Sequence, residues 1–199
     1  YNDISKLLRQ RHGKEGVFMP LPKERIYTIE DIYNLPDGER AELIDGNMYM
    51  MAPPSRRHQA IAGEIFTSIH NYLKQKNGSC IPYIAPFAVF LNNDNTNYVE
   101  PDISVICDPN KLSDRGCEGA PDWIIEIVSP SSRNMDYYTK LFKYRTAGIR
   151  EYWVVDPAKE RITVYNFENE TTDDYSFHDT VKVGIYSDFS IDFSKLNLS

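Results

Sequence analysis

Two carboxylates stand inside otherwise apolar segments of this 199-residue chain. Glu126 lies in residues 123–128, which are apolar on both sides of a period-2 alternation, as in a central strand covered on both faces. Asp102 follows Pro101 and leads into a second strand-like run, residues 103–107. Each carboxylate must be paired, protonated or bound to a metal, because an isolated buried charge costs several kcal/mol. The pair therefore predicts half of the divalent-metal site of a phosphodiesterase.

The predicted ligands suit magnesium. Mg²⁺ prefers near-octahedral oxygen ligation, with one or two carboxylates and with waters and a substrate phosphate in the remaining positions. Asp102 and Glu126, helped by the backbone carbonyl of Ile127, supply such oxygens, so Mg²⁺ or Mn²⁺ is the expected cofactor. In the alternative interpretation, Asp102 caps a turn and Glu126 forms a buried ion pair.

Lys140 is the expected cationic partner of this site. It follows Tyr137 by three residues and precedes Tyr144 by four, so it shares their stripe on a predicted helix, whereas Lys143 is displaced toward solvent. From the packed face, the ammonium group can approach the carboxylates and stabilise charge on a phosphoryl group or orient a water. The alternative is an ordinary lysine that extends its charged end to solvent.

Glu42 and His58 are further candidate catalytic residues. Glu42 alternates with Ile44 in a predicted hairpin strand, so its side chain could point inward. His58 lies at the start of a predicted helix, on the face that carries Ile61 and Ile65. A lone histidine on such a face is more often a core residue than a ligand, so both interpretations of His58 stay open.

The elements that must position these residues form a mixed pattern of strands and helices. We expect an α/β (or α+β) fold, a mixed sheet flanked by helices, with an additional N-terminal hairpin and additional C-terminal strands. The hairpin has Asp45-Gly46 at its turn, a pair that suits a type I′ turn. The expected strands are residues 42–51 (the hairpin), 80–91, 98–107, 123–128, 151–155 and 161–167, with one or two more near residues 175–183. One helix is expected to start at Thr28, and two others to span residues 55–76 and 136–146.

Composition is that of one globular domain. Hydrophobic residues make up 41% and charged residues 26% of the chain. Residues 1–25 are expected to form a polar leader with one weak helix at residues 4–11, and residues 26–199 a single domain. No run approaches the roughly 18 apolar residues that a membrane span needs, so no membrane partner is expected.

Cysteine and charge content bound the environment and the partners. The three cysteines are odd in number and lack CxxC spacing, which argues against disulfides and zinc and favours a reducing cytoplasm. The net charge of −7 counts against a protein that binds nucleic acid by bulk electrostatics. However, residues 168–192 hold seven acidic residues and one lysine, a balance of −6, which leaves about −1 elsewhere. The rest of the chain can therefore still bind DNA locally.

Taken in order, several short blocks resemble the Uma2 family of restriction-endonuclease-like proteins. They lie between Thr28 and Phe167 and comprise residues 42–46, 53–55 with His58, 101–105, 120–122, 126–132, 140–141 with Tyr144, 148–149 and 151–157. The resemblance implies a restriction-endonuclease-like fold of the PD-(D/E)xK superfamily, a divalent-metal site, DNA as substrate and a homodimer.

The resemblance also assigns roles to residues. It makes Asp102 the motif aspartate and Glu126 the second acidic residue. The lysine that the superfamily usually has two residues after the acid is replaced here by Val128, and in Uma2-like chains the next helix supplies it, which fits Lys140.

Three hypotheses follow. The first is an Mg²⁺-dependent DNA endonuclease in which Asp102 and Glu126 hold the metal and Lys140 assists the attacking water. The second is a catalytically silent nuclease fold that binds DNA or protein. The third is a structural protein whose buried carboxylates are ion-paired. Metal titration separates the first from the second, because a silent module should not bind Mg²⁺ or Mn²⁺ at the carboxylate pair.

Overall fold

The structure, a computed structural model, describes residues 25–92 and 94–198. The expected weak helix at residues 4–11, and all of the expected polar leader except Arg25, lie outside these residues. The division into a leader and a single domain stays a prediction.

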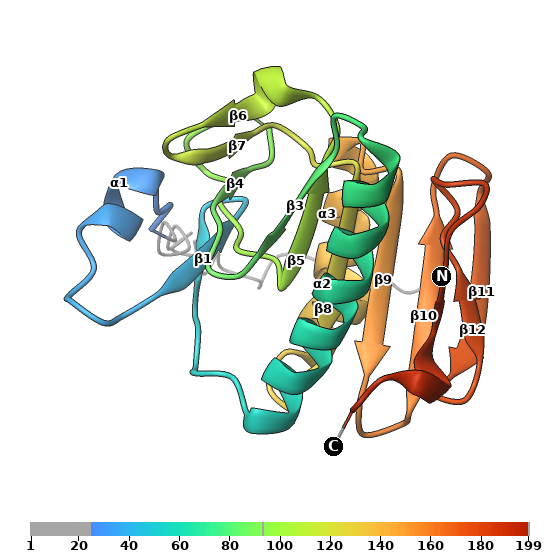
Figure 1. The fold of residues 1–199 in the computed structure, drawn as a ribbon. Helices are drawn as coiled ribbons and strands as arrows, with labels where there is room; N and C mark the ends of the chain where they lie inside the picture. The colour runs from blue at the N-terminus through green and yellow to red at the C-terminus, as the bar shows by residue number, and fades with distance from the viewer. Residues whose placement is uncertain (1–24, 93, 199) are drawn as a thin grey trace, which may run out of the picture.

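A six-stranded mixed sheet forms the centre of the fold (Figure 1). Its two central strands, β8 and β9, run parallel, and every other neighbouring pair is antiparallel. The parallel pair requires a crossover connection, which a helix supplies. The strands stand in the order β11 (Thr171–Ser176), β10 (Arg161–Asn166), β9 (Glu151–Asp156), β8 (Trp123–Ile127), β5 (Ile103–Ile106) and β3 (Ile81–Ile84).

One helix packs on each face of this sheet. Helix α2 (Arg56–Lys76) buries an apolar stripe against one face, where Ile61, Ile65 and Ile69 are fully buried. Helix α3 (Lys140–Ala147), preceded by a π-helical turn (Met135–Thr139), packs on the other face. The helices end where the sequence indicated: Asn77 after α2 and Gly148 after α3 both adopt the left-handed conformation of a helix C-terminus.

Alternation along β8 decides which helix each of its side chains meets. Ile125 and Ile127 belong to the core under α2, whereas Ile124 and Val128 belong to the core under α3. Glu126 shares the parity of Ile124 and Val128, so its side chain points toward α3.

The remaining elements surround the sheet (Figure 1). The predicted hairpin is present, and Asp45 and Gly46 at its turn have φ values of 49° and 76°, as a type I′ turn requires. The predicted mixed sheet with flanking helices is confirmed. The other elements are α1 (Ile29–Tyr33), β1 (Ala41–Ile44), β2 (Asn47–Met50), β4 (Val89–Phe90), β6 (Leu112–Ser113), β7 (Gly116–Glu118), β12 (Thr180–Lys182), β13 (Ser190–Asp192) and the 3₁₀ turns Pro109–Lys111 and Phe193–Lys195.

Two expected strands are shorter than predicted. Residues 80–91 divide into β3 in the main sheet and β4 in a separate three-stranded sheet with β7 and β6. Residues 98–107 likewise reduce to β5, which begins at Ile103. Pro86 lies between β3 and β4, and proline cannot donate to a strand ladder, so the chain changes sheets there.

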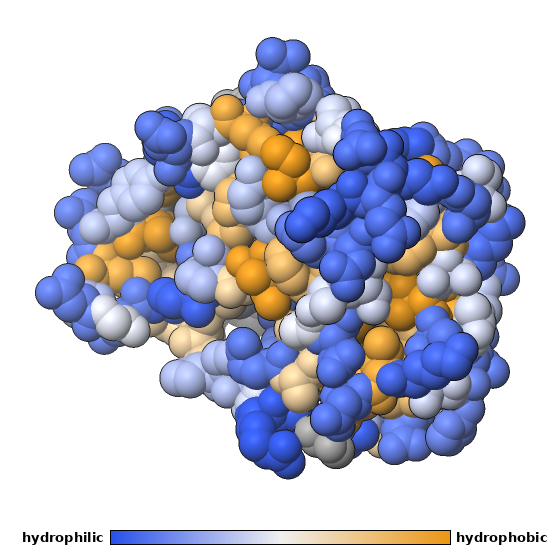
Figure 2. Space-filling view, viewed as in Figure 1, coloured by the Kyte–Doolittle hydropathy of each residue, from blue (hydrophilic) through white to orange (hydrophobic). Residues whose placement is uncertain are grey.

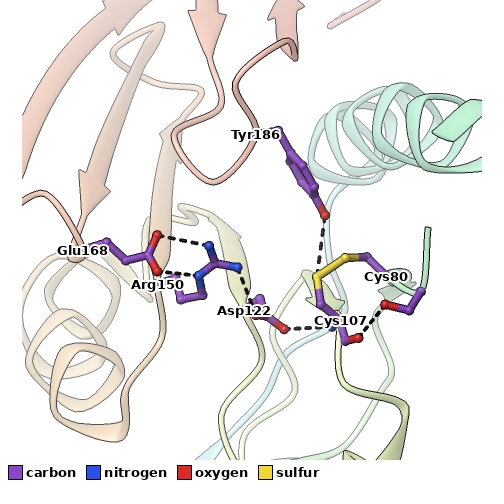
Figure 3. The surroundings of a disulfide bond; sticks show 7 residues. Cys80, Cys107, Asp122, Arg150, Glu168 and Tyr186 are labelled. Atoms are coloured by element: carbon purple, nitrogen blue, oxygen red, sulfur yellow. Dashed lines mark hydrogen bonds and ion pairs between the residues drawn. A yellow bond between two sulfur atoms is a disulfide. The ribbon is translucent and has the colours of Figure 1, made fainter.

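The prediction that the chain lacks disulfides was wrong. Cys80 and Cys107 form a disulfide, and Figure 3 shows it beside Asp122 and Tyr186. The antiparallel register of β3 and β5 pairs Ile81 with Ile106, so the residue before one strand meets the residue after the other. Sequence spacing did not reveal this, because the two cysteines are 27 residues apart. A cytoplasmic location stays a prediction, and the cysteines no longer argue for it.

The disulfide sets an expected thiol count. Cys117 is the free cysteine of the three, and it is buried. Protein unfolded without a reductant should therefore expose one titratable thiol per chain, and protein unfolded after reduction should expose three. A colorimetric thiol assay measures both counts, and three thiols before reduction would contradict the disulfide.

The surface on the α2 side is mostly polar. Figure 2 shows hydrophilic side chains over most of this face, with apolar side chains gathered in separate patches among them. Over residues 25–92 and 94–198, we find no helix with the length and apolar character of a membrane span.

Candidate functional site

The two predicted ligands belong to neighbouring segments, since Asp102 directly precedes β5 and Glu126 lies in β8. β5 pairs with β8, and Ile103 stands opposite Ile125. One step further along this register, Asp102 stands across from Glu126. The backbone N–H of Ile127 donates a hydrogen bond of 2.7 Å to Oδ2 of Asp102, which ties the two segments together. The structure therefore brings together the carboxylates that the sequence placed on two separate strands.

Asp102 also contacts His58. Its Oδ1 lies 2.8 Å from Nε2 of His58, and both side chains are largely buried, at 19% and 14% exposed. The start of α2 presents the imidazole, where Oγ of Ser55 caps the helix by accepting the N–H of His58. His58 thus contacts a predicted ligand, and this hydrogen bond fits both of its interpretations, so the role of His58 stays a prediction.

Lys140 joins two buried carboxylates. Its Nζ donates a hydrogen bond of 2.8 Å to Oε1 of Glu126 and lies 2.8 Å from Oε2 of Glu42, and all three side chains are buried. The N–H of Glu100 also donates to Oε1 of Glu42 at 3.0 Å. Strand β1 of the hairpin therefore brings Glu42 to the site, as its alternation with Ile44 indicated.

Two members of the site were missed by the sequence analysis. Asp136 is buried, and its Oδ1 lies 3.9 Å from Nζ of Lys140. Tyr144 is fully buried and donates its hydroxyl hydrogen to Oε1 of Glu126 at 2.6 Å. Both residues stand four positions from Lys140, one before and one after it, so the helical stripe that selected Lys140 contained the signal for both.

The prediction that Lys143 points to solvent was wrong. The side chain is buried, and its ammonium group pairs with Asp45 at the tip of the β1–β2 hairpin. Because the hairpin folds over α3, the helix has a wider buried face than a helix packed on a sheet alone. This covering element could not be read from the helix pattern.

The site holds more buried negative charge than positive charge. Burial raises the pKa of Glu126 to about 8 despite the opposing effect of Lys140, and the negative charge of Asp102 adds to the rise. Burial likewise raises the pKa of Asp136 to about 6, again against Lys140. Burial alone would lower the pKa of Lys140, but Glu126, Glu42 and Asp136 hold it well above its ordinary value. Three buried carboxylates thus share one ammonium group.

This charge balance and the donor set fit a hard divalent cation. Carboxylate and carbonyl oxygens are the ligands that Mg²⁺ and Mn²⁺ prefer, and a cation would offset the excess negative charge. Over the described residues 25–92 and 94–198, no three or more acidic, histidine or cysteine side chains lie together as a group that could hold a metal ion. The expected Mg²⁺ site at Asp102, Glu126 and the Ile127 carbonyl therefore stays a prediction.

We expect Glu126→Gln to preserve or raise the stability of the metal-free protein. The folded-state pKa of Glu126, about 8, lies above the ordinary value of 4.5, so ionisation of this side chain opposes folding. The stability present below pH 4.5 is then lost as the pH rises through about 8. Melting temperatures measured between pH 5 and 9 should fall less steeply in the variant. A strongly destabilised variant at every pH would favour a structural ion pair.

Comparisons with known proteins find one matching family, a curated relative and a similar solved structure. The model of the Uma2 family, described as "Putative restriction endonuclease", matches residues 29–194. The uncharacterized protein slr1290 of Synechocystis sp. is 27% identical over 156 residues, 78% of each chain. A crystal structure from Anabaena variabilis, described as a "putative nuclease belonging to DUF820", has a TM-score of 0.69 and 22% identity, and the match covers 83% of this chain and 94% of that one.

Proposed function

This chain belongs to the Uma2 family of restriction-endonuclease-like proteins, and from that membership and the geometry of the site we propose that it is a divalent-metal-dependent DNA endonuclease. The observation that carries the proposal is the cross-strand pair of Asp102 and Glu126. Asp102 accepts the backbone N–H of Ile127, the residue that follows Glu126, and the buried Lys140 donates a hydrogen bond to Glu126.

The side chains of the site have separable roles. Asp102 and Glu126, with the carbonyl oxygen of Ile127, would hold Mg²⁺ or Mn²⁺. When bound, such an ion supplies charge stabilisation for the phosphoryl group and a more acidic water. Lys140 offsets part of the negative charge of Glu126 and Glu42 and pairs with both carboxylates. His58 orients Asp102.

The contacts of Lys140 favour a role other than the one that we expected. We expected its ammonium group to act on the phosphoryl group or on the attacking water. In the structure, that ammonium group is buried and hydrogen-bonded to Glu42 and Glu126. We therefore propose that Lys140 acts through these carboxylates rather than on the substrate.

The direct test is a nuclease assay on supercoiled plasmid and on short DNA duplexes. The endonuclease proposal expects nicked or linear plasmid with Mn²⁺ or Mg²⁺, and intact plasmid when a chelator removes the metal. A parallel calorimetric titration measures Mn²⁺ binding. Binding of Mn²⁺ without cleavage of any DNA substrate would contradict the proposed activity.

The burial of Lys140 gives the silent-module alternative a specific basis. A lysine fully engaged by two carboxylates can hold a fold together without any catalysis. The same titration separates the two proposals. A silent module should bind DNA or a protein partner and should show no Mn²⁺ binding that depends on Asp102 and Glu126.

We expect the protein to be a homodimer. Cleavage of both strands of a duplex generally calls for two active sites, and two-fold symmetry is the commonest way to provide them. Light scattering at micromolar concentration should give about twice the chain mass of 23.0 kDa. A monomer mass over the whole concentration range would count against this expectation.

A further inference from the structure

Two hydrogen-bond donors converge on one oxygen atom of Glu126. The Tyr144 hydroxyl group donates to Oε1 at 2.6 Å, and Nζ of Lys140 donates to the same atom at 2.8 Å. Both donors come from α3, one turn apart on its buried face. Two hydrogen bonds to Oε1 fix the rotation of the Glu126 carboxylate about its Cγ–Cδ bond. Oε2 is then the oxygen that remains for another ligand.

The two donors differ in how firmly they fix this rotation. Lysine has a long, flexible side chain, and Lys140 divides its hydrogen bonds between Glu126 and Glu42. Tyr144 is fully buried, and its ring packs edge-on against Tyr152 with ring centroids 5.0 Å apart and an interplanar angle of 80°. Its hydroxyl oxygen therefore has little freedom to move. Of the two donors, Tyr144 is the better fixed point for the carboxylate.

We propose that Tyr144 is a positioning residue for the metal centre. Its hydroxyl group holds Oε1 of Glu126, so that Oε2 is left to ligate the cation. This inference rests on the proposed metal-dependent function and extends it to a residue that does not touch the metal or the substrate. Groups that orient a metal ligand through a hydrogen bond are worth about 10–100-fold in metal affinity or activity.

The chain offers a matched control for the test. Tyr152 is also fully buried and donates its hydroxyl hydrogen inside the same core, but to the backbone carbonyl of Asp136 at 2.9 Å. Tyr144→Phe and Tyr152→Phe therefore each remove one buried hydroxyl group and its hydrogen bond. The two variants differ in whether the lost bond reaches Glu126.

The experiment titrates Mn²⁺ alone into the wild-type protein and both variants by calorimetry, and records the melting temperature of each metal-free protein. Tyr144→Phe should weaken Mn²⁺ binding by about 10–100-fold, whereas Tyr152→Phe should leave it unchanged. The two variants should show similar losses in melting temperature, since each loses one hydrogen bond. This result would separate positioning of the ligand from a general loss of packing.

Each other outcome overturns the inference. Wild-type affinity in Tyr144→Phe would show that Lys140 alone orients Glu126. Equal weakening in both variants, or a Tyr144→Phe protein that does not fold while Tyr152→Phe does, would assign Tyr144 a structural role. Absence of Mn²⁺ binding by the wild-type protein would overturn the metal site itself, and only that outcome also removes the proposed function.

Discussion

Replacing Asp102 by asparagine should lower the rate of metal-dependent DNA cleavage by at least about 10²–10³-fold, the scale for losing one electrostatic group of an active site. The variant loses a negative charge that the cation needs, yet its amide keeps the shape of the side chain. The amide oxygen can still accept the N–H of Ile127, so the contact between the two segments survives. Plasmid cleavage and Mn²⁺ titration should therefore both fail in a protein that melts near the wild-type temperature.

Asp122→Asn is the matched control. Asp122 also accepts a backbone N–H, that of Cys107 at the far end of β5, and pairs with Arg150 (Figure 3). Asp102 precedes β5 and Asp122 precedes its antiparallel partner β8, so the two substitutions make the same chemical change at opposite ends of this strand pair. Cleavage should persist in Asp122→Asn. Equal loss of activity in both variants would attribute the effect to the strand pair rather than to the metal ligand.

Replacing Lys140 by methionine should destabilise the fold by about 3–5 kcal/mol, the cost of removing one partner from a buried ion pair. Glu42 and Glu126 would remain buried without their shared cation. In a chain of this size, 1 kcal/mol corresponds to about 2–4 °C, so the melting temperature should fall by roughly 10 °C. Thermal unfolding followed by circular dichroism measures this directly.

Two further variants test the reason for that loss. Lys143→Met removes a lysine from the same helix, but its partner Asp45 is 66% exposed and can be solvated by water, so the cost should stay near or below about 1 kcal/mol. Glu42→Gln added to Lys140→Met should recover part of the lost stability, because it removes one of the stranded charges. A mild loss in Lys140→Met, equal to that in Lys143→Met, would contradict a buried charge cluster.

The order of elements could be predicted because each signal is local. The Asp45-Gly46 turn, the apolar stripe of α2 and the helix ends at Asn77 and Gly148 are all encoded within a few neighbouring residues. The apolar run around Glu126 also identified a central strand, since both of its faces are covered.

The parts that escaped prediction depend on contacts between distant segments. Cys80 meets Cys107 only because β3 and β5 pair in one register. Lys143 is buried only because the hairpin folds over α3 and brings Asp45 to it. Asp136 is different, since it lies four residues before Lys140 and its burial could have been read from the helical stripe.

The site residues are far apart in the sequence, so the site can form only after most of the chain has been synthesised. The Lys140–Glu42 contact spans 98 residues, and the structure between them contributes His58, Asp102 and Glu126. A ribosome-bound chain that ends before α3 thus carries four of these five groups but cannot neutralise its acids. Under the proposed function, a polypeptide that ends before α3 lacks Lys140 and should not cut the DNA of its own cell.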